Sequence, residues 1–153
     1  MADMKEKIIA ALQKAYCMEL ETVLNYLANS IHLEGVRAEQ IQSALAADIQ
    51  EELGHARQVG ERIKQLDGQV PGSLALVFDQ KHLQPPADPT DVVAVIRGVL
   101  EAEDQAIRHY KSIIELTEKV DYVTQHLAIT LLAQEEAHWH KFEGYLKEYF
   151  PKG

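Results

Sequence analysis

Hydrophobic residues recur at intervals of three and four along four long stretches of the chain, which is the spacing of the buried face of an α-helix. We expect helices at about residues 4–34, 37–66, 89–119 and 121–149. Each would be about 40–45 Å long at 1.5 Å per residue. The pattern predicts an all-α protein with four helices of similar length.

The connections between these stretches predict how the helices are arranged. A short turn joins the first helix to the second and the third to the fourth, so each pair should form an antiparallel hairpin. We expect Asp88, followed by a proline, to cap the third helix and Asp121 to cap the fourth. Residues 67–88 would form a long crossover between the hairpins. Its apolar run Leu74–Phe78 needs a surface, either along the bundle or on a partner subunit. We expect one domain over residues 1–153.

The charge balance narrows the classes of partner. The chain has 24 acidic and 15 basic residues and a formal net charge of -9. Such a surface repels nucleic-acid phosphates and attracts cations. No apolar run approaches the ~20 residues of a membrane helix, and the charged N-terminal segment does not resemble a signal peptide. We therefore expect a cytoplasmic protein that binds neither nucleic acid nor membrane. The single cysteine, Cys17, excludes an internal disulfide, and we interpret it as a small buried hydrophobe.

Polar residues interrupt each apolar pattern near its middle. Each helix carries one glutamate there, and the second and fourth helices add a histidine three residues later, a spacing that places both side chains on one face: Glu19, Glu52, His55, Glu103, Glu135 and His138. Glu21 and Glu101 stand two residues from the first and third of these glutamates. They fall about 200° around the helix, so we place them on the solvated side. Glu101 is the main alternative to Glu103.

The four glutamates also match in height along the bundle. Glu19 and Glu52 each lie about 16 residues from Gly35 in the first turn, or about 24–26 Å. Glu103 and Glu135 lie at about the same distance from the second turn. Antiparallel packing should therefore bring all four carboxylates to one level in the core.

Four carboxylates in a bundle core predict bound cations. Each would cost several kcal/mol to desolvate, and no Lys or Arg stands three or four residues from any of them. Two divalent cations balance four carboxylates, with the two imidazoles as neutral ligands, and this mixed set suits iron or manganese better than structural zinc. Tyr26 and Tyr110 follow Glu19 and Glu103 by seven residues. They are either hydrogen-bond donors to the carboxylates or core aromatics.

At these residues the chain resembles the ferritin-like superfamily, in particular bacterioferritins and the Dps-like proteins with the bacterioferritin type of di-iron site. The resemblance covers all four helices and is most specific at Glu19–Tyr26, Glu52–His55, Glu103, Asp121–Thr124 and Gln134–His138. It implies two iron ions, with manganese as the alternative. Terminal ligands would be Glu19 and Glu103, bridging ligands Glu52 and Glu135, and His55 and His138 would each bind one metal.

Three departures from the family pattern limit what the resemblance implies. Leu53 stands where bacterioferritins have a haem-binding methionine, so we expect no haem. Only Tyr149–Gly153 follows the fourth helix, so we expect no fifth helix of the kind used in 24-subunit cages. A homo-oligomer is expected, with a dodecamer favoured over a 24-mer and a dimer possible. The basic N-terminal tail with which some Dps proteins bind DNA is missing.

The resemblance implies a ferroxidase that stores iron and protects against oxidative stress, oxidising Fe(II) with oxygen or hydrogen peroxide. The alternative is a di-metal enzyme without storage, either a manganese catalase-like peroxide scavenger or a small di-iron oxidase or oxygenase. A third interpretation is an interaction bundle that keeps the metal site without turnover. Iron and manganese, and oxygen and peroxide, are all compatible with these residues.

Overall fold

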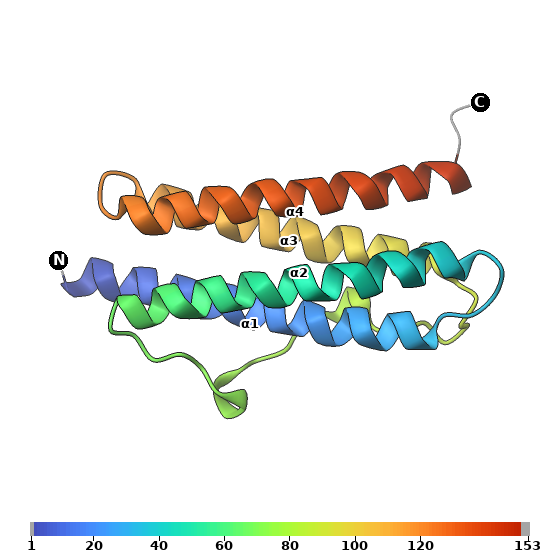
Figure 1. Ribbon diagram of the computed structural model, residues 1–153, viewed down its shortest axis with the longest axis horizontal. Coiled ribbons are helices and arrows are strands. Elements are labelled where there is room, and N and C mark those ends of the chain that lie inside the picture. Colours follow the sequence, from blue (N-terminus) through green and yellow to red (C-terminus); the bar gives the residue numbers. More distant parts are fainter. Residues whose placement is uncertain (1, 151–153) are drawn as a thin grey trace.

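Four long helices form an antiparallel bundle in the computed structural model, which describes residues 2–150 (Figure 1). Helices α1 (Ala2–His32) and α2 (Ala38–Gln65) make one hairpin, and α3 (Val92–Thr117) and α4 (Tyr122–Tyr149) make the other. The segment between α2 and α3 crosses the bundle and contains two short 3₁₀ turns, η1 (Ser73–Ala75) and η2 (Lys81–Leu83). The predicted all-α bundle with a long crossover is confirmed.

One of the two predicted helix caps is wrong. Asp121 does cap α4, since its carboxylate accepts a hydrogen bond from the Thr124 backbone N–H at 3.0 Å. The cap of α3 is Asp91 rather than Asp88, so this helix begins at Val92 instead of residue 89. The Asp88 carboxylate accepts from the backbone N–H of Thr90 at 2.9 Å and stabilises a turn that comes before the helix.

Two apolar clusters fill the interior, one towards each end of the bundle. The first is built around Tyr26, Leu45, Ile96 and Phe142, and the second around Leu12, Ile63, Ile113 and Leu131. Burying each of these large side chains contributes about 1.5–3 kcal/mol. The predicted polar side chains lie in the middle of the helices, so the two apolar clusters hold them at a fixed height.

The crossover covers one face of α1, and this overturns the placement of Glu21 on the solvated side. The Glu21 side chain is buried, and its carboxylate accepts from the backbone N–H groups of Asp79 and Gln80 at 3.1 and 2.8 Å. Cys17 is half-buried rather than a core residue, and its thiol lies 3.1 Å from the Val77 carbonyl oxygen. Burial raises the pKa of this thiol.

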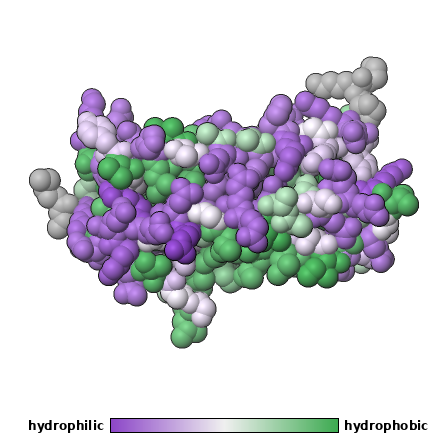
Figure 2. Space-filling view, viewed as in Figure 1, coloured by the Kyte–Doolittle hydropathy of each residue, from purple (hydrophilic) through white to green (hydrophobic). Residues whose placement is uncertain are grey.

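Exposed apolar side chains gather on the α1 side of the molecule and on the turn of the crossover that protrudes from it (Figure 2). The exposed large apolar residues of these elements are Leu24, Leu27 and Ile31 on α1 and Leu74, Val77 and Phe78 on the crossover, and Leu53 is exposed on α2. Leu74 and Val77 are 103% and 77% exposed, so this part of the apolar run does not pack along the bundle. Within residues 2–150 no helix combines the length and the hydropathy of a membrane span.

Candidate metal centre

Six buried side chains from all four helices converge in the middle of the bundle. They are the six that the sequence predicted: Glu19 from α1, Glu52 and His55 from α2, Glu103 from α3, and Glu135 and His138 from α4. Each is at most 5% exposed. Glu103 rather than Glu101 belongs to the cluster, because Glu101 is partly exposed and faces Arg108. His140 is exposed and lies outside the cluster.

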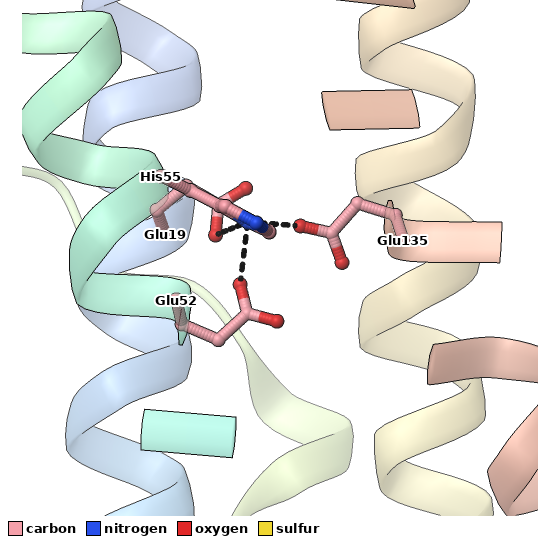
Figure 3. Close-up of side chains that lie close together, drawn as sticks. All are labelled: Glu19, Glu52, His55 and Glu135. Carbon is pink, nitrogen blue, oxygen red and sulfur yellow. Dashed lines mark hydrogen bonds and ion pairs between the residues drawn. The ribbon is translucent and has the colours of Figure 1, made fainter. Parts of the chain in front are cut away.

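Around His55 three carboxylates point at one ring nitrogen (Figure 3). The Nδ1 atom of His55 lies 3.4 Å from Oε2 of Glu19, 3.5 Å from Oε2 of Glu52 and 3.0 Å from Oε1 of Glu135. One ligand atom from each of these four residues lies within 4.8 Å of the others. These four donors could hold a single cation.

A second set of the same kind surrounds His138. Its Nδ1 atom lies 2.9 Å from Oε1 of Glu52, 3.8 Å from Oε1 of Glu103 and 3.7 Å from Oε2 of Glu135. These four residues also place one ligand atom each within 4.8 Å of the others. Glu52 and Glu135 therefore take part in both sets, with one carboxylate oxygen facing each histidine. The two rings are stacked with centroids 6.2 Å apart.

The two tyrosines hold the carboxylates that belong to one set only. The Tyr26 hydroxyl on α1 donates to Oε1 of Glu103 on α3 at 2.5 Å, and the Tyr110 hydroxyl on α3 donates to Oε1 of Glu19 on α1 at 2.7 Å. Both rings are also buried in the apolar clusters. Of the two interpretations left open by the sequence, hydrogen-bond donation is therefore present, and it cross-links the two hairpins symmetrically.

Two further residues fix the histidine rings and were not found from the sequence. Nε2 of His55 donates to Oε1 of Gln134 at 2.5 Å, and Nε2 of His138 donates to Oε2 of Glu51 at 2.8 Å. These bonds leave Nδ1 of each ring free to face the carboxylates. The signal was in the sequence, because Glu51 and Gln134 each directly precede the glutamate of a Glu-x-x-His motif.

The electrostatics of the cluster favour binding of positive charge. Burial raises the pKa of Glu52 and the pKa of Glu103 well above the usual range of a glutamate, and neighbouring carboxylates raise both pKa values further. Burial also raises the pKa of Glu135, to about 7. Burial alone would lower the pKa of His138, but the neighbouring carboxylates of Glu135 and Glu52 outweigh it and raise that pKa to about 12. Glu52, Glu103, Glu135 and His138 therefore retain protons strongly, as expected of excess buried negative charge. Burial alone would also raise the pKa of Glu19, but interactions with neighbouring residues of the cluster lower it to about 2.

The unpaired atoms of the cluster fit metal ions. Within the described residues, five buried side-chain polar atoms have no hydrogen-bond partner, and four of them belong here: Oε2 of Glu19, Oε1 of Glu52, Oε2 of Glu103 and Nδ1 of His138. Leaving such an atom unpaired costs about 1–3 kcal/mol. Carboxylate oxygens and imidazole nitrogens are ligands that iron and manganese accept. The residues present therefore fit two divalent cations.

A third group of possible ligands adjoins the cluster. Asp48, Glu51 and His138 could also converge on one ion. The Lys141 ammonium lies 3.0 Å from both oxygens of Asp48 and already neutralises it. We therefore assign this group to the support of His138 rather than to a metal.

Comparison with known proteins agrees with this geometry. A family model described as "Ferritin-like domain" matches residues 9–149. The DNA protection during starvation protein of Pyrococcus furiosus is 28% identical over 141 residues, covering 90% of this chain and 76% of the relative. The bacterioferritin of Desulfovibrio desulfuricans is 26% identical over 142 residues, covering 92% and 75%.

Solved structures with the same fold include di-iron proteins. A ferritin-like di-iron carboxylate protein of Bacillus anthracis has a TM-score of 0.84 at 20% identity and covers 95% of this chain and 99% of its own. A dodecameric thioferritin, the bacterioferritin-related protein of Bacteroides fragilis, has a TM-score of 0.79 at 27% identity, covering 97% and 92%. The family model covers residues 9–149, nearly the whole chain, and this match establishes the family. The chain belongs to the ferritin-like domain family.

Proposed function

We propose that the six-residue cluster is a di-iron ferroxidase centre and that the protein oxidises and stores iron. The observation that carries this proposal is the pair of ligand sets that share Glu52 and Glu135. Sharing two carboxylates holds two cations side by side, which suits the joint removal of two electrons. Glu19 with His55 would complete the ligands of one ion, and Glu103 with His138 those of the other.

Fe(II) and a small oxidant are the proposed substrates. Two Fe(II) ions supply two electrons. One oxygen molecule that accepts these electrons and two protons becomes hydrogen peroxide, and one hydrogen peroxide that accepts two electrons and two protons becomes two water molecules. The cavity between the carboxylates has a volume of about 10 Å³, enough for one water-sized molecule. This small size disfavours an organic substrate of an oxygenase.

The surrounding residues would position the ligands and attract the metal. Hydrogen bonds from Tyr26 and Tyr110 orient Glu103 and Glu19, while Gln134 and Glu51 orient the imidazoles. The net charge of -9 would concentrate Fe(II) near the protein. Manganese is the alternative metal, since the same donors accept it, and peroxide disproportionation would then be the alternative activity.

We also propose a homo-oligomeric assembly, with a dodecamer as the favoured form. The B. fragilis protein is described as a dodecamer, and it is 27% identical to this chain. The exposed apolar side chains of α1, α2 and the crossover supply the surface that subunit contacts require. Leu53 remains our reason to expect no haem.

Metal analysis combined with particle mass tests the proposal. The purified protein is loaded with Fe(II) under anaerobic conditions, and its metal content and its particle mass, by light scattering, are measured. Oxygen or peroxide is then added with further Fe(II). Storage predicts a large hollow particle that oxidises many irons per subunit. A dimer that stops at two irons would overturn storage and favour a di-metal enzyme. Glu52→Ala should lose both metals, and Glu101→Ala, which alters an acid outside the cluster, should lose none.

A further inference from the structure

The crossover places one buried polar side chain beside the metal cluster. Between η1 and η2, from Leu76 to Gln80, the side chains are exposed or half-buried except that of Gln80, which is 7% exposed. Burying an amide without hydrogen bonds is costly. The position of Gln80 therefore depends on specific partners.

The partners of the Gln80 side chain both lie on α1, within two turns of Glu19. The side-chain amide of Gln80 donates to Oγ1 of Thr22 at 2.7 Å, and its oxygen accepts from Nδ2 of Asn25 at 2.9 Å. The backbone N–H of Gln80 donates to the buried Glu21 carboxylate at 2.8 Å. Glu21 thus fixes the backbone of the crossover, while two bonds that can break and reform hold the side chain.

Gln80 also stands between two spaces. On the inner side is the cavity of about 10 Å³ that the four glutamates line. On the outer side, between α1, α3 and the crossover, is a surface hollow of about 430 Å³ that reaches Lys14 and Arg108. Met18 and Gln80 are the two residues that line both spaces.

We propose that Gln80 is the gate between this hollow and the metal centre. A cation passes inward or outward when the side chain leaves Thr22 and Asn25, and the passage closes when both hydrogen bonds reform. Gln80 is not a ligand in this scheme, so it sets the rates of metal exchange and not the affinity. The inference rests on the proposed metal centre.

Stopped-flow measurement of Co(II) binding and release tests the gate. Co(II) binds carboxylate and imidazole sites with a change in visible absorption, and working without oxygen keeps it in the divalent state. Gln80→Ala removes both side-chain hydrogen bonds. Two bonds of ordinary net strength, about 1 kcal/mol each, correspond to about a thirtyfold change in rate. We expect the association and dissociation rate constants both to rise about thirtyfold and their ratio to stay constant. Gln69→Ala, at another glutamine of the crossover that lines neither space, should change neither.

Thr22→Val provides a second test that leaves the crossover sequence intact. It removes the oxygen that accepts from Gln80 and keeps the shape of the side chain, so both rate constants should rise a few-fold. Unchanged rates in both folded variants, with normal Co(II) binding, would overturn the gate alone. A changed equilibrium affinity would also overturn it, because Gln80 would then act on the ligands. If the unaltered protein bound no Co(II), the metal centre would fail and the gate with it.

Discussion

Alanine substitutions at Glu52 and at Glu19 should differ in how much metal-dependent stability they remove. Glu52 belongs to both ligand sets, whereas Glu19 belongs to one. In the proposed centre, loss of Glu52 would take a ligand from each cation, and loss of Glu19 would take a ligand from one. The comparison therefore tests the bridging arrangement itself and not only the presence of metal.

The magnitude follows from linkage between binding and folding. A ligand at 100 times its dissociation constant stabilises the native state by about 2.7 kcal/mol per site. Two sites give about 5 kcal/mol, and each kcal/mol raises the melting temperature of a domain of this size by about 2–4 °C. The unaltered protein should therefore gain about 10–20 °C on saturation with metal. Glu19→Ala should gain about half of that, and Glu52→Ala close to nothing.

Thermal unfolding followed by circular dichroism measures these shifts, with Co(II) present or absent and the protein concentration held constant. Each variant is compared with its own metal-free form, so any direct effect of the substitution on packing cancels. Glu101→Ala is the matched control and should retain the full shift, because its side chain faces Arg108 outside the cluster. Equal shifts for Glu19→Ala and Glu52→Ala would refute the bridging role of Glu52. A full shift in Glu52→Ala would refute the site.

Three further substitutions test the scaffold by urea unfolding. Hydrogen bonds from Thr124, together with an arginine, overcome burial and lower the pKa of Asp121. Asp121→Asn keeps a capping oxygen but removes the negative charge at the helix N-terminus, so it should cost about 0.3–1 kcal/mol at neutral pH. This difference should disappear as the pH falls from about 4 through the lowered folded pKa, because the carboxylate stabilises the fold only while ionised. Phe142→Ala empties a fully buried position and should cost about 3–5 kcal/mol. Gly98→Ala should cost about 1–3 kcal/mol, because its Cβ would overlap the His82 carbonyl and displace the crossover from α3.

The helices and the cluster could be predicted because they depend on periodic patterns. An apolar stripe with a period of 3.6 residues fixes which face of a helix is buried, and equal spacing from the turns fixes the height at which Glu19, Glu52, Glu103 and Glu135 meet. The start of α3 was misplaced because Asp88 and Asp91 are both capable of capping. Which of the two carboxylates accepts from the free N–H groups at the start of α3 depends on the backbone conformation of the preceding turn.

The residues that orient the histidines were harder to find for a geometric reason. Glu51 and Gln134 lie about 100° around their helices from the glutamates that follow them, so a single-helix pattern places them outside the core. Each reaches a histidine on the opposite hairpin, Glu51 on α2 contacting His138 on α4 and Gln134 on α4 contacting His55 on α2. The contact depends on how α2 and α4 pack against each other, and the spacing of residues within one helix does not predict that packing.

Glu21 shows why the crossover lies beyond such patterns altogether. Helical periodicity predicts which face of a helix packs against the other helices. The partners of Glu21 are two backbone N–H groups of the crossover, and a pattern of side chains does not predict such contacts. No Lys or Arg stands three or four residues from Glu21 along α1, which is consistent with this role, since backbone donors satisfy a carboxylate as well as a cation does. A crossover held by such hydrogen bonds needs no periodic pattern of apolar residues and few apolar contacts. Access to the metal centre would then be controlled by Gln80, in the segment whose position depends least on the pattern that builds the bundle.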